Sequence, residues 1–230
     1  SSDLVFQELG TVDNGSGTHA HGQFMPFNAI DFHKEINHNT TDIYGNALPD
    51  SNPRKNETLY GFTVGNDYYF GMEIDAEFLM PPSGKDAWGH DIIFDFVGDD
   101  DFWLYVDGEL VIDLGGIHSA LGASVNYSTG EVTINSSKPN NSLYEIFESN
   151  YKARNSEASS TEVQEYLDGF FQSKTIEGKT YQVFKDYTTH NVRIFYMERG
   201  AGASNLRMRF NLAAVHQGEV LLTKEVTSDS

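Results

Sequence analysis

The chain has 230 residues, of which 39% are apolar and 13% aromatic, so it can bury a substantial core and is not a disordered chain. It carries 34 Asp and Glu against 15 Lys and Arg, a formal net charge of −19, which argues against nucleic acid as a partner. The absence of cysteine excludes disulfides, thiolate metal sites and cysteine nucleophiles, and no apolar run approaches the roughly 20 residues that would insert into a membrane.

The first part of the chain predicts few regular elements. Residues 1–58 are polar and rich in Gly, Asn, His and Asp, which favours long loops with short strands. Residues 68–80 are aromatic and partly alternating, which predicts either a strand pair or one bent strand. Residues 90–97 predict a further strand, with Ile93 on one face and two phenylalanines on the other.

Residues 102–114 form the clearest local pattern. Two β-prone runs flank Asp107-Gly108. Asp-Gly favours a two-residue type I′ turn, because both central residues of that turn need a positive φ. The segment therefore predicts a β-hairpin.

Two helices are predicted after this hairpin. Ser142 and Glu145 have the spacing of a capping box ahead of an amphipathic run, and Ser159 and Glu162 repeat that spacing. Both lie in an insertion at about 119–188.

The last part of the chain predicts strands again. Residues 189–197 and 205–213 are two such segments, joined by a glycine-rich loop at 198–204. Residues 218–226 look like the first strand of another domain, and they resemble the opening strand of the B-type pilin domains of Gram-positive surface proteins.

Three adjacent carboxylates, Asp99, Asp100 and Asp101, come just before the hairpin. Carboxylates so close together repel each other, and a hard dication relieves that repulsion. Calcium accepts six to eight oxygen ligands in irregular geometry, so a site built on loops favours calcium over magnesium. The alternative is a solvated acidic turn.

The loop at 198–204 is the second chemical feature. Gly200 and Gly202 permit positive φ or close backbone approach, and exposed carbonyls there could complete a cation shell. The alternative is an ordinary glycine-rich hairpin loop.

Together these segments resemble a known family. The runs FDFVGDDDFWLYVDGELVIDLGGIH and VRIFYMERGAGASNLRMRF closely resemble the fibro-slime domain of the protective-antigen-type (PA-fourteen) lectin-like superfamily, over about residues 24–215 except the insertion. The resemblance implies an all-β fold, a β-sandwich of two antiparallel sheets with a mostly helical insertion. Residues 1–217 would form this domain, and 218–230 the start of a following stalk domain or a tail.

The resemblance also implies a calcium ion held by an Asp-Asp pair joined by a cis peptide bond. Aligning on the Tyr105-Val-Asp-Gly segment puts this pair at Asp99 and Asp100, with Asp101 beside it. A slip of one residue would make the pair Asp100 and Asp101, and both alignments remain open.

A second loop supplies a side-chain oxygen and a backbone carbonyl in lectin members of the superfamily. Aligning on the segment that begins at Arg193 makes Glu198 the candidate side-chain ligand and Gly200 the candidate carbonyl donor. Fungal adhesins of the superfamily tend to have Asn where this chain has Glu198, which leaves the identity of that ligand open.

Further residues are candidates for contact with a sugar whose vicinal hydroxyls complete the calcium shell. An aromatic face beside the metal would supply apolar contact. The candidates are Trp88 and Trp103 as aromatic walls, either of which could instead be core, and His118, Arg199 and Asn205 near the two loops. For His118, closing its own turn is the favoured alternative.

These observations predict a calcium-dependent carbohydrate-binding adhesin domain, secreted and displayed at the cell surface as part of a larger cell-wall-anchored protein. Its expected partners are host or microbial surface glycans, with pilin or stalk domains following it. A calcium-rigidified structural or protein-binding stalk domain is the alternative. A glycoside hydrolase would need two suitably spaced carboxylates. We expect no enzyme activity, since motifs such as G-x-S-x-G are absent.

Overall fold

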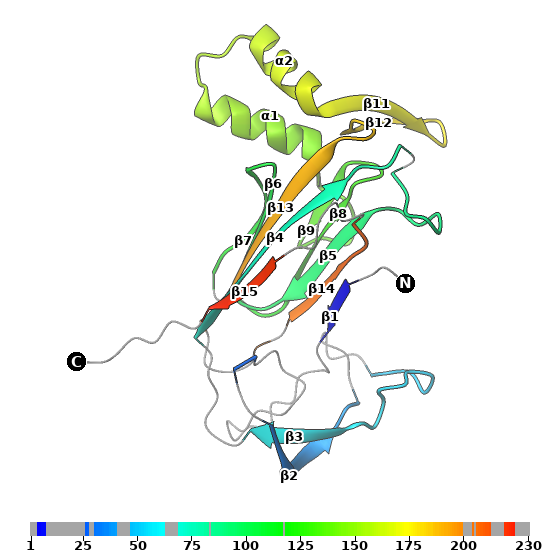
Figure 1. The fold of residues 1–230 in the computed structure, drawn as a ribbon, viewed down its shortest axis with the longest axis vertical. Coiled ribbons are helices and arrows are strands. Elements are labelled where there is room, and N and C mark those ends of the chain that lie inside the picture. The colour runs from blue at the N-terminus through cyan, green and yellow to red at the C-terminus, as the bar shows by residue number, and fades with distance from the viewer. Residues whose placement is uncertain are drawn as a thin grey trace, which may run out of the picture.

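The structure is a computed structural model, and its description covers residues 4–7, 26–27, 30–40, 47–62, 69–82, 84–116, 118–199, 204, 206–212 and 219–223. These residues form a β-sandwich of two antiparallel sheets, seen edge-on in Figure 1, which confirms the predicted fold class.

The two sheets draw their strands from distant parts of the chain. The first has the order β1 (Leu4–Gln7), β14 (Leu206–Phe210), β5 (Ile93–Gly98), β8 (Leu121–Asn126), β9 (Glu131–Ile134) and β10 (Asn141–Ser142). The second has the order β15 (Glu219–Thr223), β4 (Phe70–Leu79), β13 (Thr189–Glu198), β6 (Asp101–Val106) and β7 (Glu109–Leu114). A separate pair is made by β2 (Ile30–His38) and β3 (Thr58–Phe62).

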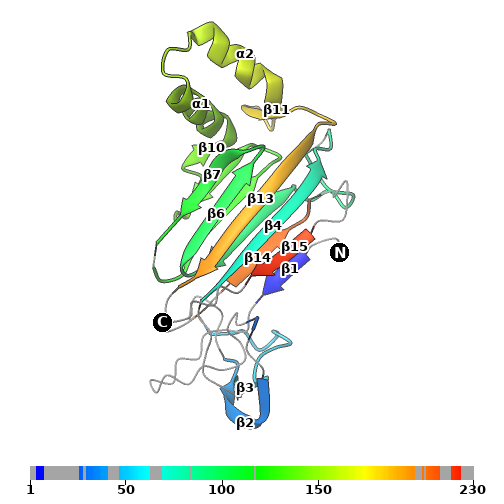
Figure 2. The same ribbon diagram turned by 60° about the vertical axis from the view of Figure 1, so that its left-hand side comes forward.

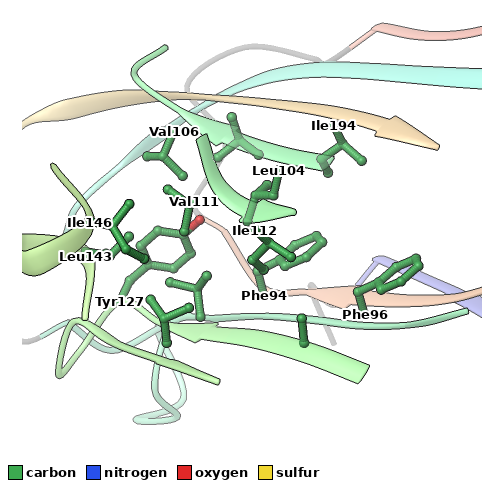
Figure 3. Packing of buried hydrophobic residues seen from close by; sticks show 14 of the residues in the cluster. Phe94, Phe96, Leu104, Val106, Val111, Ile112, Tyr127, Leu143, Ile146 and Ile194 are labelled. Carbon is green, nitrogen blue, oxygen red and sulfur yellow. The ribbon is translucent and has the colours of Figure 1, made fainter. Parts of the chain in front are cut away.

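The core lies between the two sheets, because alternate residues of each strand point inward. Phe94 and Phe96 of β5 are fully buried and face Phe102 of β6, and the rings of Phe96 and Phe102 stack with centroids 3.7 Å apart. Figure 3 shows Phe94 and Phe96 of β5 on one side of this core and Leu104 of β6 on the other, with Ile194 of β13 beside Leu104.

The strands predicted around this core are confirmed. Within the predicted segment 68–80, Phe70–Leu79 form the single strand β4 rather than a strand pair. In β5, Ile93 is half-buried on one face while Phe94 and Phe96 are buried on the other, as their alternation predicted.

The predicted hairpin is confirmed as β6 and β7, with Asp107 at φ 50° and Gly108 at φ 80° in the turn. Side-chain contacts hold this turn against the start of β13. Asp107 Oδ2 lies 2.6 Å from Nδ1 of the buried His190, and Asp107 Oδ1 accepts a hydrogen bond from the backbone N–H of Asn191 at 2.8 Å.

Both predicted helices are present. Helix α1 (Leu143–Arg154) begins after Ser142, whose hydroxyl accepts the N–H of Glu145, and α2 (Ser160–Phe170) begins with a complete capping box. They are followed by the strand pair β11 (Phe171–Ile176) and β12 (Lys179–Phe184). The insertion is shorter than predicted, because β8 and β9 belong to the first sheet.

A buried glutamate joins the insertion to the sandwich. Glu109 of β7 accepts hydrogen bonds from both terminal nitrogens of Arg154, one of them at 2.7 Å, and from the hydroxyl of Tyr166 at 2.5 Å. Asn150 Nδ2 donates to the carbonyl oxygen of Leu110 at 3.1 Å. The burial of Glu109 disfavours its charge, but these donors outweigh burial and lower its pKa below the ordinary value.

The last described strand corrects an expectation. Residues 219–223 form β15 and pair antiparallel with β4, with Val220 opposite Ile74. This segment is therefore an edge strand of the sandwich rather than the opening of a separate domain. Neither helix in the described part of the chain is long and apolar enough to cross a membrane.

We predict that Glu109→Gln lowers the free energy of unfolding at pH 7 by about 2 kcal/mol, because the neutral amide loses the charge-assisted hydrogen bonds that Arg154 and Tyr166 donate to the buried carboxylate. A carboxylate with a lowered pKa stabilises the fold above its unfolded pKa, about 4.3, and loses this contribution as the pH falls. The difference between the two proteins should therefore shrink toward pH 3. Urea unfolding at several pH values measures both effects.

Glu165→Gln is the matched control, since Glu165 is exposed on α2. Equal stability of the two variants at pH 7 would contradict the assigned role of Glu109.

Candidate metal and carbohydrate site

Two places where the chain crosses between the sheets lie side by side. Asp99 and Asp100 connect β5 of the first sheet to β6 of the second, and residues 199–205 connect β13 of the second to β14 of the first. Because Asp101 pairs with Met197 and Gly98 pairs with Leu206, the two crossings must be neighbours. The reading of 198–204 as an ordinary hairpin loop is wrong, since β13 and β14 belong to different sheets.

The acidic side chains at these crossings are buried. Asp99, Asp100 and Asp101 are 8%, 3% and 2% exposed, and Glu198 is 1% exposed. The alternative of a solvated acidic turn is therefore wrong. Buried carboxylates are costly unless they are hydrogen-bonded, paired with a cation or bound to a metal.

The backbone at the first crossing turns at Asp100, which has φ 59°. Asp is among the few residues other than glycine that adopt this left-handed conformation readily. All peptide bonds of the described residues are trans. The cis peptide bond expected between the paired aspartates is therefore absent. The chain turns from β5 to β6 at Asp100, whose φ is positive.

Arg199 links the two crossings. Its backbone N–H donates to Asp100 Oδ2 at 2.7 Å, its Nε donates to Asp101 Oδ2, and its terminal nitrogen donates to Asp101 Oδ1 at 2.8 Å. Asp101 Oδ1 also accepts the N–H of Gly116 at 2.6 Å. The hydrogen bonds and the charge of Asp101 raise the pKa of Arg199. Asp101 is therefore the partner of the guanidinium, and the choice of Asp99 and Asp100 as the metal-binding pair stays a prediction.

The buried hydroxyl of Tyr196 lies within the influence of two of the carboxylates. Its hydroxyl donates to Glu198 Oε2 at 3.2 Å, and it is also hydrogen-bonded to the buried Ser204. Burial raises the pKa of Tyr196 well above its usual range, and the charges of Glu198 and Asp99 raise it further. Glu198 therefore contacts this hydroxyl directly, and the charge of Asp99, almost a hundred residues away in the chain, also acts on it.

The donor set suits a hard cation. It consists of carboxylate oxygens, which calcium and magnesium prefer, and contains no sulfur. Arg199 offsets one of the four buried charges, and a dication would offset two more. The described side chains do not form a complete cage, since no three His, Asp or Glu among them are close enough to hold an ion by themselves.

The other candidate residues are placed differently. Trp88 is 61% exposed in the loop before β5, whereas the aspartates follow β5, so about six residues of strand, roughly 20 Å, separate them. Both ring nitrogens of His118 contact backbone carbonyls, of Leu114 and Ser119, each at 3.0 Å, so it closes its own turn. Gly200 and Asn205 lie outside the described residues.

Trp103, one of the two predicted aromatic walls, lies next to the site on the outer face of the second sheet, between the inward-facing Phe102 and Leu104. A groove of about 640 Å³ runs over this face. It is lined by Tyr69, Trp103, Tyr105, Phe195, Met197 and Arg199, among others. The alternation of β6 and β13 could have revealed it, because the aromatics occupy the positions between the buried ones.

Comparison with known families gives a direct assignment. The model of the PA14 domain matches residues 55–222, more than two thirds of the chain. The chain belongs to the PA14 domain family. PA14 domains are of the carbohydrate-binding, adhesin type and occur in extracellular and surface proteins. The superfamily part of the resemblance is thus confirmed, and the narrower fibro-slime assignment stays a prediction.

Curated relatives of this PA14 chain come from Dictyostelium discoideum. It is 40% identical over 88 residues to protein psiB, 37% over 70 residues to psiP and 35% over 86 residues to psiR. These matches cover 38%, 30% and 36% of the chain but only 14%, 8% and 8% of the relatives, so the chain spans a small part of each. No solved structure matches it significantly.

We predict that Arg199→Ala lowers the free energy of unfolding in EDTA, and lowers it more than Arg193→Ala does. The substitution leaves the carboxylate of Asp101 buried without its cation, and the loss is below the full cost of a broken buried pair because the guanidinium is half-exposed. Arg193→Ala is the matched control. Its partners Glu73 and Asp75 lie on the sheet surface, so it should cost less than about 1 kcal/mol. Equal losses in urea unfolding would contradict the role given to Arg199.

Proposed function

We propose that this PA14 chain is a calcium-dependent carbohydrate-binding adhesin domain of a secreted cell-surface protein. The observation that carries the proposal is the burial of Asp99, Asp100 and Glu198 at two adjacent sheet crossings. A protein core does not bury several carboxylates together for stability, since each one carries a desolvation cost. Their retention at one end of the sandwich favours a role in binding.

In this proposal Asp99, Asp100 and Glu198 hold the calcium ion, and the carbonyl of Gly200 remains a predicted further ligand. When bound, calcium supplies coordination for vicinal hydroxyls of a sugar. The chain's own contribution is orientation. Arg199 holds Asp101 and the backbone of the second crossing in place, so the other carboxylates keep their positions.

The placement of the site agrees with a role in adhesion. The acidic crossings lie at one end of the sandwich, and helices α1 and α2 lie at the other, as Figure 2 shows. The proposed partners are host or microbial surface glycans, and cell-wall anchoring within a larger protein that carries further stalk domains is part of the proposal. The domain binds its partner in this proposal and catalyses no reaction.

We predict that calcium raises the melting temperature of the protein and that EDTA lowers it, since a ligand that binds the folded state stabilises it by mass action. Asp100→Asn should abolish the shift. Asn tolerates the left-handed backbone and can still accept the N–H of Arg199, but it lacks the charge. Differential scanning calorimetry with and without calcium measures the effect.

Asp168→Asn, on the exposed side of α2, is the matched control and should retain the full calcium shift. An unchanged melting temperature on adding calcium to the wild-type protein would contradict the metal proposal.

We predict that the full chain binds glycans on an array in calcium and loses this binding in EDTA and as Asp100→Asn. Stabilisation by calcium without glycan binding would favour the alternative, a structural or protein-binding stalk domain rigidified by the ion. Release of free sugar from bound glycans, measured by chromatography, would contradict the proposal that the domain does not catalyse.

A further inference from the structure

We propose that the groove on the outer face of the second sheet binds a neutral oligosaccharide chain, so that the protein recognises several consecutive sugar units rather than one terminal sugar. This inference rests on the proposed function, because it extends the carbohydrate site from the acidic crossings onto the sheet. It identifies the ligand class as uncharged oligosaccharides longer than one unit.

The floor and walls of the groove come from strand alternation. In β6, β13 and β4 the residues between the buried ones point outward, and the pairing puts Trp103 beside Phe195, and Phe195 beside Glu73. The next outward row joins Tyr105, Arg193 and Asp75 in the same way. The rings of Tyr105 and Phe195 also pack edge to face, with centroids 5.9 Å apart. These strands present their outer face to the viewer in Figure 2.

The hollow is produced by a glycine. Gly71 of β4 lies opposite Met197, where any other residue would project a side chain from the sheet. Gly71 is among the residues that line the groove, and Tyr69, 61% exposed, forms its wall on that side. On the other side the Trp103 ring lies over Gly115, where an added Cβ would come within 3.1 Å of the indole. Gly71 therefore leaves space on the Tyr69 side of the groove, and Gly115 lets the Trp103 ring lie close to the backbone on the other side.

The charges of the groove select a neutral ligand. Arg199 is bound to Asp101, and Glu73 is paired with Arg193 at 3.1 Å. The described part of the groove therefore offers no unpaired cation to a sulfate or phosphate group, and the formal charge of −19 repels anions generally. A pyranose ring suits this lining, because it has an apolar face that can stack on an aromatic ring and a rim of hydroxyls that can bond the polar groups.

The groove is continuous with the proposed calcium site. Its lining ends at Glu198 and Arg199, the residues at which β13 leaves the sheet. A sugar whose hydroxyls reach the acidic crossings would direct the next unit of its chain toward Met197 and Trp103. The volume of about 640 Å³ falls within the range of ordinary ligand pockets, which hold molecules larger than one monosaccharide.

The test uses the two tryptophans of the chain. Trp88→Phe removes the tryptophan at the far end of the sandwich and leaves Trp103 as the single tryptophan, whose emission is excited selectively at long wavelength. Cello-, manno- and chito-oligosaccharides of one to six units are titrated separately in calcium. We expect at least one series to shift the emission of Trp103 and to bind about tenfold more tightly at four units than at one.

A pair of matched substitutions tests the groove without disturbing the core. Tyr69→Ala removes an exposed groove residue, and Tyr187→Ala removes a tyrosine that is 70% exposed and does not line the groove. Tyr69→Ala should weaken binding of the tetrasaccharide about threefold to tenfold, the usual contribution of one aromatic contact, and leave the monosaccharide unchanged. Tyr187→Ala should change neither.

The outcomes separate this inference from the proposed function. If none of the three series changes the emission of Trp103, or if both tyrosine variants bind alike, the groove proposal is overturned even when calcium-dependent glycan binding holds. If Tyr69→Ala weakens binding that EDTA and Asp100→Asn leave intact, the groove stands and the calcium proposal fails. Preferential binding of sulfated heparin oligosaccharides to the groove would overturn the neutral-ligand assignment.

Discussion

The candidate site depends on one constraint, the double pairing of β6 with β13 and of β5 with β14. The pair β5 and β14 lies in the first sheet and the pair β6 and β13 in the second. The chain must therefore pass from one sheet to the other twice at the same end of the sandwich. The crossing from β5 to β6 uses two residues, which leaves Asp99 and Asp100 no room to turn away into solvent. Long-range strand pairing thus brings together acidic groups that lie almost a hundred residues apart in sequence.

Electrostatics at this end of the sandwich is a compromise between stability and binding. Arg199 reduces the repulsion among the acidic groups. It also makes Asp101 less accessible to a metal ion, since both carboxylate oxygens of Asp101 accept hydrogen bonds from the guanidinium. The large aromatic core, with Phe96 stacked on Phe102 beneath the crossings, provides the stability that such a cluster requires. A PA14 domain can therefore keep acidic residues buried that a smaller core would not tolerate.

Local features of the fold were predictable from sequence, and features that depend on strand pairing were not. Asp107-Gly108 and the caps at Ser142 and Ser159 each specify the backbone around them, and the structure has these elements at the expected residues. Side-chain alternation does not specify the sheet to which a strand belongs, so β13 and β14 could be read as a hairpin, and β8 and β9 as part of the insertion. The reversal at Asp100 could arise from a cis bond or a positive φ, and sequence alone does not distinguish them. For the site, the sequence located the acidic residues but not the bridging by Arg199 or the outer groove.

The way the insertion docks has a consequence for solubility. Strand β7 is an edge of the second sheet, and an uncovered edge strand can pair with the edge of another molecule. Helix α1 lies against β7, and the side chain of Asn150 donates a hydrogen bond to the backbone carbonyl of Leu110 on that edge. The insertion therefore covers this edge and hinders polymerisation by strand addition. Damage to its attachment would first expose this edge to pairing with other molecules, while the sandwich itself remained folded.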